Sequence, residues 1–286
     1  MAEKVVGVIG GSGLYEMEGL EHVETLSLTT PFGPPSDSFV VGRLEGVKVA
    51  FLPRHGKGHR ISSSSLNFRA NIYGMKMLSV QSIIAVSAVG SMKESIHPGH
   101  MVIPDQFIDR TTGRIGTFFN DGIVGHVSFA DPVCPVLNQI LFESGKKVGA
   151  TVHKGGTYIC IEGPQFSTRA ESKLYRSWGV DIIGMTNLPE AKLAREAEIC
   201  YATIAFATDY DCWHETAGDV SIGDVLRILA ESTKIAKSAI RLAVKQIPEK
   251  RECVCSDALK YAVITGKKSI PEKTKKDLEL IIGKYI

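Results

Sequence analysis

The sequence has no long hydrophobic run and no excess of charge of one sign, and each absence excludes a class of partner. Apolar stretches such as 82–89 and 201–207 are far shorter than the roughly 20 residues of a transmembrane helix. Residues 1–13 contain Glu3 and a glycine cluster, where a signal peptide would be unbroken and apolar. The 33 basic and 31 acidic residues create no field that would attract nucleic acid. We therefore expect a cytoplasmic protein with a small-molecule partner.

Cysteine is too sparse to build a disulfide-stapled fold, with six residues in a chain of 286. No spacing among the six marks a zinc site, so we expect no metal. The pair Cys253-Val-Cys255 is the exception that needs an interpretation. It is either two unrelated thiols on a linker or a redox or stapling pair, and a disulfide between such near neighbours would be strained.

Short β-branched runs alternate with longer amphipathic stretches, a pattern that predicts one large α/β domain with a largely buried sheet. The expected strands are 4–9, 38–44, 47–53, 82–89, 101–104, 156–161, 182–184 and 201–208. The expected helices are 67–78, 135–148, 168–178, 189–198 and 222–246. A charged linker after residue 246 divides the chain into a body, 1–246, and an extension, 247–286. We expect two short helices in the extension, at 256–264 and 272–282.

Two carboxylates, Asp209 and Asp211, end the last strand expected in the body. Side chains alternate along a strand, so the two would share one face. A carboxylate only accepts hydrogen bonds, which suits a purine edge with an amino group and a protonatable nitrogen. A pair of metal ligands or a loop-capping pair is the commoner reason for this spacing. Other residues therefore have to decide between these interpretations.

Four predicted strand ends carry groups suited to an anion. They are the glycine-rich turn with Ser12, the pair Arg54 and His55, the small residues Ser87 and Ala88, and Thr186, which we place at a helix N-terminus. Small residues free backbone N–H groups, arginine offers a fork of donors, and a helix N-terminus favours negative charge. The turn matches neither a Walker motif nor a dinucleotide-binding fingerprint. Each feature alone is ordinary, but four of them at the carboxyl ends of one sheet predict a bound phosphate.

A set of motifs in order resembles the trimeric purine nucleoside phosphorylases, in particular the 5'-methylthioadenosine phosphorylases. The motifs are GGSGL at 10–14, TPFG at 30–33, RHG at 54–56, NFRAN at 67–71, DQFIDRT at 105–111, EGP at 162–164, MT at 185–186 and ATDYDCW at 207–213. The resemblance implies a single α/β domain whose central mixed, partly barrel-like sheet is flanked by helices. It also implies a homotrimer or a dimer of trimers.

The activity implied by this resemblance is that of a pentosyltransferase. Inorganic phosphate, a co-substrate, would attack the anomeric carbon of 5'-methylthioadenosine with inversion and release adenine and 5-methylthioribose 1-phosphate. No cofactor would be needed. Positive charge develops on the sugar and negative charge on the departing base, so phosphate below the ring and a proton donor at the purine N7 would both stabilise the transition state.

Carried over position by position, the resemblance also implies the role of each site residue. Phosphate contacts fall on Ser12, Arg54, His55, Ser87, Ala88 and Thr186. The nucleoside contacts fall on Met185 under the ribose, Phe166 beside the base, Asp209 and Asp211 at the purine edge, His126 from a neighbouring subunit, and the apolar wall of Ile222, Val225 and Leu226 around the 5' substituent. Asp209 is the expected partner of N7, and Asp211 would accept a hydrogen bond from the 6-amino group.

Two alternatives stay open. The same fold could act on adenosine, inosine or methylthioinosine, although relatives specific for 6-oxopurines place an asparagine where this chain has a carboxylate. Alternatively, a protein that keeps this pocket could bind nucleosides without catalysis. Release of adenine that depends on phosphate would separate an enzyme from a binding protein.

Overall fold

The structure is a computed structural model that describes residues 3–11, 13–14, 16–214 and 222–286. The strands are β1 (Val5–Gly10), β2 (Leu20–Leu26), β3 (Phe39–Leu44), β4 (Val47–Pro53), β5 (Ser82–Ser91), β6 (Met101–Ile103), β7 (Gln106–Arg110), β8 (Val152–Lys154), β9 (Thr157–Ile161), β10 (Ile182–Gly184) and β11 (Cys200–Asp209). The helices are α1 (Phe68–Met77), α2 (Pro135–Lys147), α3 (Arg169–Ser177), α4 (Glu190–Glu196), α5 (Ile222–Gln246), α6 (Glu272–Asp277) and α7 (Glu279–Ile282). Short 3₁₀ turns occur at Ser63–Ser65, Val254–Asp257 and Lys267–Ser269.

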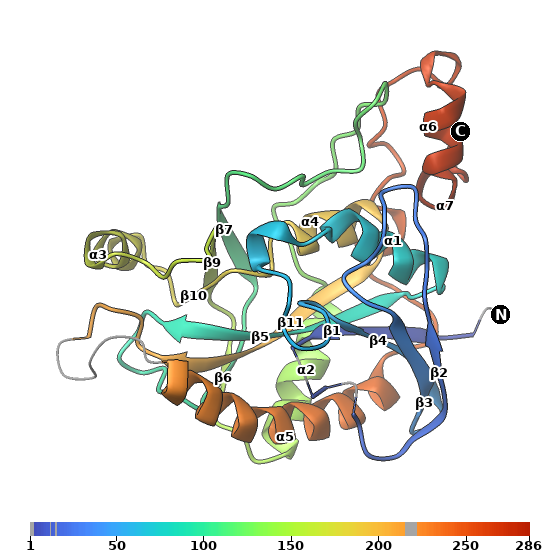
Figure 1. The fold of residues 1–286 in the computed structure, drawn as a ribbon. Coiled ribbons are helices and arrows are strands. Elements are labelled where there is room, and N and C mark those ends of the chain that lie inside the picture. Colours follow the sequence, from blue (N-terminus) through green and yellow to red (C-terminus); the bar gives the residue numbers. More distant parts are fainter. Residues whose placement is uncertain (1–2, 12, 15, 215–221) are drawn as a thin grey trace.

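All the strands belong to one mixed sheet, which is organised around β5 (Figure 1). Strands β4, β1, β5 and β11 run parallel, and β10 pairs antiparallel with the last residues of β5. In the part of the chain that the structure describes, the pairings do not close the sheet into a ring. The expected α/β domain with a mixed sheet flanked by helices is therefore confirmed, with an open sheet.

Helices cover both faces of the parallel core. In Figure 1, α1 and α4 lie on one face of the sheet and α2 and α5 on the other. Side chains of β1 alternate between the two faces: Val5 and Ile9 pack in the cluster that includes α1 and α4, and Val6 and Val8 in the cluster that includes α2 and α5. Burial on both faces is typical of parallel strands, and it explains why these strands are almost continuously apolar.

The eight expected strands and the five expected body helices are all present, with ends within two residues of the prediction. The prediction missed β2, β7 and β8. The sequence of β2, LEHVETL, contains two glutamates, and its residues are mostly exposed at the edge of the sheet. β8 has only three residues. Such strands carry little apolar alternation, so the pattern on which the prediction depends is weak.

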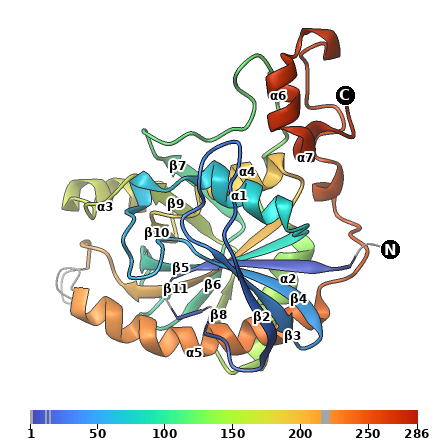
Figure 2. The ribbon, with the colours of Figure 1, turned by 45° about the vertical axis from the view of Figure 1, so that its right-hand side comes forward.

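The extension lies along one side of the body, and α6 and α7 lie at the opposite end of the molecule from α5 (Figure 2). The expected helix at 256–264 is wrong. Apart from the short turn Val254–Asp257, this segment pairs its backbone with another part of the chain: His126 N donates to Ala262 O at 2.9 Å, and Ile264 N to Val124 O at 3.0 Å. The expected helix at 272–282 is present but interrupted at Leu278.

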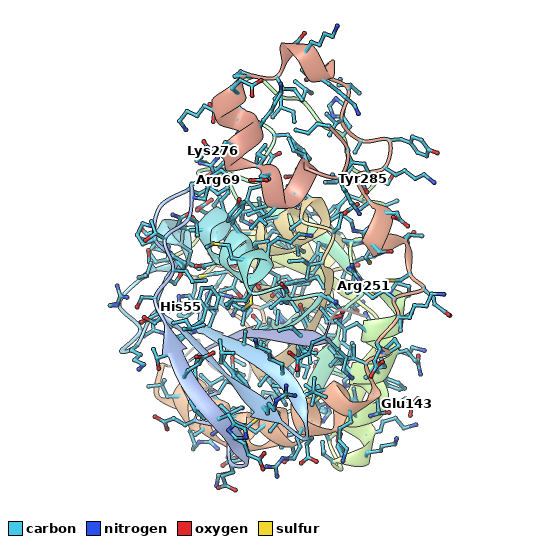
Figure 3. All side chains as sticks on the ribbon, turned by 90° about the vertical axis from the view of Figure 1, so that its right-hand side faces the viewer. His55, Arg69, Glu143, Arg251, Lys276 and Tyr285 are labelled. Atoms are coloured by element: carbon cyan, nitrogen blue, oxygen red, sulfur yellow. The ribbon has the colours of Figure 1, made fainter. Side chains whose placement is uncertain are left out.

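A single buried carboxylate anchors the extension. Glu198 is 3% exposed and accepts hydrogen bonds from Leu259 N at 3.0 Å and from the Tyr285 hydroxyl, and it forms an ion pair with Lys284 at 2.6 Å. Arg251 donates to the carbonyl of Glu198 at 2.6 Å. Figure 3 labels Arg251 and Tyr285, which both belong to the extension. Among the described residues, no helix has the length and apolar character needed to cross a bilayer.

Candidate active site at the carboxyl edge of the sheet

The parallel core brings the predicted anion-binding strand ends to one edge. Gly10 at the end of β1 is in register with Pro53 at the end of β4, and Gly90 near the end of β5 is opposite Asp209 at the end of β11. Carboxyl ends of neighbouring parallel strands form the crevice where open α/β sheets bind ligands. The groups that follow these strands therefore face a common site, although they are up to about 200 residues apart in sequence.

Arg54 is almost completely buried, at 2% exposure, and its charge is balanced inside the protein. Its Nε and Nη2 donate to the two Glu190 carboxylate oxygens, each at 2.9 Å, and Nη1 and Nη2 donate to the carbonyls of Val86 and Ile9. Burial alone would lower the pKa of Arg54, but the Glu190 carboxylate raises it above its ordinary value. Since a guanidinium has about five N–H donors, these contacts leave at most one for a ligand.

Glu190 belongs to a buried polar network that the sequence did not suggest. Its Oε1 also accepts from the Tyr201 hydroxyl at 2.9 Å, and Asn187 Nδ2 donates to that hydroxyl at 2.7 Å. Glu190 is not among the site residues predicted from the sequence. Its partner Arg54 lies 136 residues away, so no local pattern could have identified the pair.

His55 is neutral at physiological pH. Its Nδ1 lies 2.9 Å from the carbonyl of Ile61, which assigns the proton to Nδ1 and leaves Nε2 as an acceptor. Burial lowers the pKa of His55 to about 4, with a further contribution from the Arg54 charge. The ring stacks on His59, with the two centroids 4.3 Å apart. A ligand at this position therefore meets an uncharged imidazole.

Three hydroxyl groups cluster beside Arg54. Ser87 Oγ lies 3.1 Å from Thr186 Oγ1 and 3.3 Å from the Tyr158 hydroxyl. Burial raises the pKa of Tyr158 to about 12, so this hydroxyl keeps its proton. Ala88 follows Ser87 in β5 and is partly buried, opposite Phe206 of β11. The structure thus brings Ser87, Ala88 and Thr186 into one neighbourhood.

Thr186 is not at a helix N-terminus, contrary to the prediction. It lies in the bend between β10 and α4, and α4 begins only at Glu190 after the cap residue Pro189. Residues 185–187 form a bend and residues 188–189 a turn before the helix starts. Its contribution to the site is therefore a hydroxyl group rather than a helix terminus.

Asp209 and Asp211 do lie together, but not on one face of a strand. β11 ends at Asp209, its register shifts between Ala207 and Asp209, and Asp211 follows in a turn with a left-handed φ of 52°. Asp209 Oδ1 accepts from Asp211 N at 2.7 Å, and its Oδ2 accepts from Thr208 Oγ1 at 2.7 Å. The turn, and not strand alternation, therefore brings the two carboxylates together.

Both carboxyl groups hold their protons more tightly than exposed ones. Burial raises the pKa of Asp209, and the adjacent Asp211 charge raises it further, while the bonds from Thr208 and from Asp211 N partly offset both effects. Burial likewise raises the pKa of Asp211, which is 4% exposed. A buried acid with a raised pKa, in a cleft at a strand end, has the character of a proton donor.

Met185 is held in place by a residue that the sequence analysis missed. Arg114 donates to the carbonyls of Met185 and Glu162, each at 2.7 Å, and pairs with the Glu162 carboxylate at 3.1 Å. Ser63 Oγ lies 3.6 Å from Met185 Sδ. Gly163 has a φ of 69°, and a Cβ there would come within 2.5 Å of Met185 Sδ, so only glycine fits.

Phe166 is 49% exposed, so it is not part of the buried hydrophobic core. Its ring is therefore available beside the site. His126 and Leu226 are also exposed, Leu226 at 60%, and His126 belongs to the segment that pairs with the extension. Ser12 lies outside the described residues, as do the side chains of Ile222 and Val225, although the backbone of both belongs to α5.

The interpretation of Asp209 and Asp211 as metal ligands finds no support in the described part of the chain. There, one group of three or more metal-binding side chains lies together, and it consists of cysteines elsewhere in the molecule: Cys134, Cys200, Cys253 and Cys255. The sequence spacing did not reveal this group, because its cysteines come from three separate parts of the sequence.

Comparison with known proteins agrees with this arrangement. The family model of the Phosphorylase superfamily matches residues 5–244. An S-methyl-5'-thioadenosine phosphorylase of Geobacter sulfurreducens is 62% identical over 285 residues, covering 99% of this chain and 100% of the relative.

Two solved structures are also similar. A methylthioadenosine phosphorylase from an antarctic soil metagenomic library is 47% identical, with a TM-score of 0.93 over 98% of this chain and 99% of the other. The methylthioadenosine phosphorylase of Schistosoma mansoni in complex with adenine is 34% identical, with a TM-score of 0.83 over 99% and 98% of the two chains. The order of motifs, the mixed sheet and the matched residues lead to one conclusion: this chain belongs to the phosphorylase superfamily.

Proposed function

We propose that this protein is a pentosyltransferase that cleaves 5'-methylthioadenosine with inorganic phosphate, giving adenine and 5-methylthioribose 1-phosphate. Relatives that carry the name of this activity cover nearly the whole chain at 47–62% identity. A structural relative binds adenine. The observation that carries the proposal is the buried acid Asp209, whose raised pKa suits a proton donor and which lies opposite Gly90 of β5, the strand that also carries Ser87.

The phosphate end of the site uses uncharged donors. Ser87 and Thr186 offer two hydroxyl groups, and the balanced Arg54 offers at most one N–H. His55 Nε2, an acceptor in the tautomer that the Ile61 contact assigns, would take a hydrogen bond from a protonated phosphate oxygen. Hydroxyl groups already in position can orient the phosphate for attack on the anomeric carbon. Ser12 and Ala88 complete this proposed set.

The base end supplies a proton. When the glycosidic bond breaks, electron density moves to the purine and N7 becomes basic, so a carboxyl group that still holds its proton stabilises the leaving group. We assign this role to Asp209 because it is buried at the strand end and burial raises its pKa. Asp211 accepts from the 6-amino group, a contact that an inosine-type 6-oxo group would not provide. Met185 and Phe166 hold the ribose and the base between the two ends.

The remaining roles concern assembly and location. We place the enzyme in the cytoplasm as a homotrimer or a dimer of trimers, with phosphate as co-substrate and without a cofactor in the reaction. His126 of one subunit would reach into the site of its neighbour, where Ile222, Val225 and Leu226 would form the apolar wall around the 5' substituent. His126 and Leu226 are both exposed in the single chain.

The test is an assay of adenine release with and without phosphate, run on 5'-methylthioadenosine, adenosine and inosine. We expect release only with phosphate and the fastest turnover of 5'-methylthioadenosine. An apolar pocket for the methylthio group favours it over adenosine by about 10- to 200-fold. Faster turnover of inosine would contradict the specificity. Tight binding of 5'-methylthioadenosine without any adenine release would contradict the enzymatic function.

A further inference from the structure

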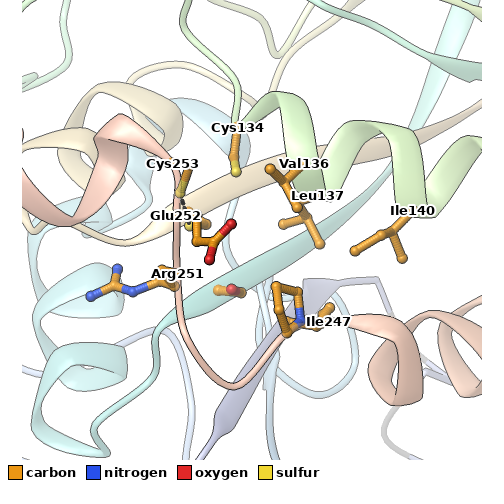
Figure 4. Close-up of a pocket in the computed structure, with 11 residues that line it drawn as sticks. Cys134, Val136, Leu137, Ile140, Ile247, Arg251, Glu252 and Cys253 are labelled. Carbon is orange, nitrogen blue, oxygen red and sulfur yellow. Dashed lines mark hydrogen bonds between the residues drawn. The ribbon is translucent and has the colours of Figure 1, made fainter.

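Four of the six cysteines gather on the side of the molecule away from the candidate active site. Their sulfur atoms all lie within 4.8 Å of one another. Cys134 caps the start of α2, Cys200 opens β11, and Cys253 and Cys255 lie at the start of the extension. Figure 4 shows Cys253 on the extension facing Cys134 at the beginning of α2. Three separate parts of the chain thus contribute thiols to one small volume.

The spacing of the sulfurs matches a tetrahedral metal centre. Zinc binds thiolates at about 2.3 Å, which places the ligand sulfurs about 3.8 Å apart. The sulfurs of Cys200 and Cys253 lie 3.3 Å apart, and all four sulfurs lie within 4.8 Å of one another. Shifts of about 0.5–1 Å in side-chain position would bring all four sulfurs to one ion. Four soft sulfur ligands in this geometry select zinc or iron over oxygen-seeking cations.

The cluster lies largely inside the protein. Three of the four side chains are buried, with exposures of 2% for Cys134, 3% for Cys200 and 1% for Cys255. A bound ion would therefore be shielded from water.

An entry route to the sulfurs is also present. A pocket beside the cluster is lined by Cys134, Cys200 and Cys253, together with Arg251 and Glu252 of the extension (Figure 4). Cys253 is the least buried of the four ligands. A metal ion can therefore reach the thiols from the side where the extension crosses the body.

The geometry points to a structural zinc site with the ligands Cys134, Cys200, Cys253 and Cys255, which ties the extension to α2 and β11. Binding releases four protons, because each thiol becomes a thiolate: Zn²⁺ and four RSH give one Zn(SR)₄²⁻ and four H⁺. No electrons are transferred. With all four positions filled by protein, the ion has no place for a substrate, so its role is to stabilise the fold.

The test is to measure metal in the full chain, expressed with zinc and purified without oxygen. We expect about one zinc per chain, and cobalt exchanged into the site should show the absorption of tetrahedral thiolate coordination. Cys253→Ser and Cys255→Ser should each retain only a small fraction of that metal. Cys160→Ser is the matched control, since Cys160 is equally buried but lies outside the cluster, and it should retain all of the zinc.

Stability supplies a second readout that does not depend on the variants folding well. A strong chelator should lower the Tm of the wild-type chain and of Cys160→Ser, and zinc should restore it. If the wild-type chain bound no zinc while its four cysteines titrated as free thiols, the proposal would be overturned. Disulfides among these four in protein purified without oxygen would overturn it as well.

Discussion

Two buried groups of charged side chains lie at the same edge of the sheet, and they differ in how their charge is balanced. Arg54 and Glu190 are joined by two hydrogen bonds of 2.9 Å, and the Glu190 carboxylate raises the pKa of Arg54. Asp209 accepts a hydrogen bond from Asp211 N, and burial raises the pKa of both carboxyl groups. The first pair joins opposite charges, whereas the second pair brings two acids together.

Breaking the balanced pair should have the largest effect. Glu190→Ala leaves a buried guanidinium without its counter-charge, and we expect the free energy of unfolding to fall by about 3–5 kcal/mol. Urea unfolding of the purified variant measures this. The control is Glu272→Ala, which removes one partner of an exposed ion pair with Lys275 and should leave stability essentially unchanged. Equal losses in the two variants would mean that burial of the pair has no special importance.

Substitutions in the pair Asp209 and Asp211 should affect catalysis more than stability. Asp209→Asn keeps the shape but removes the proton donor, so we expect kcat for 5'-methylthioadenosine to fall by about 10²–10⁴-fold, with little change in the KM for phosphate. Asp211→Asn is the matched variant and should have a smaller effect on kcat. Steady-state kinetics with both substrates varied decide the matter. A parallel rise in the phosphate KM would show that Asp209 shapes the whole site rather than the base end alone.

Glu196 extends the comparison to a third buried carboxyl group, because hydrogen bonds from Phe118 N and Thr117 Oγ1 satisfy it only in part. Burial raises the pKa of Glu196 from 4.5 to about 7. The folded state therefore holds this proton more tightly than the unfolded state, and stability falls as pH rises between these two values. We expect Glu196 to account for about 1–3 kcal/mol of that fall. In Glu196→Gln, the stability curve measured by denaturation at pH 4.5–8 should be flatter, and an unchanged curve would contradict the assignment.

The smallest effect is expected for the hydroxyl pair. Ser87→Ala or Thr186→Ala removes one neutral donor, so the KM for phosphate should rise by about 3- to 10-fold with kcat nearly preserved. Since the two hydroxyls lie 3.1 Å apart, the double variant should lose less than the sum of the single losses. Additive losses would mean that the hydroxyls act independently. Ser65→Ala, in an exposed turn, is the control.

The sequence predicted those features that depend on local pattern. β1, β4, β5 and β11 were expected because buried parallel strands are continuously apolar, and residues that follow such strands must meet at one edge. Asp209, Ser87 and Arg54 were therefore found together as expected. The prediction that a helix covers 256–264 failed because pairing with 124–126 outweighs the local helix preference, and no local pattern encodes that partner.

Features formed by residues far apart in the sequence could not be predicted from the sequence alone. Glu190 as the partner of Arg54, and Arg114 as the support of Met185, become apparent only when the sheet brings their elements together. The four cysteines show the same limit. The nearest two are separated by one residue, but the other two lie 53 or more residues earlier in the chain.

Glu198 connects the extension to β11, a strand of the candidate active site. This glutamate lies two residues before β11, the strand whose other end carries Asp209. Its carboxylate depends on Leu259, Lys284 and Tyr285 for its contacts. A shortened protein that stopped after α5 would keep every proposed catalytic side chain and yet lose these hydrogen-bond and ion-pair partners of Glu198, close to the start of the strand that carries Asp209. The last forty residues therefore support the start of this strand and are part of the structure on which the site depends.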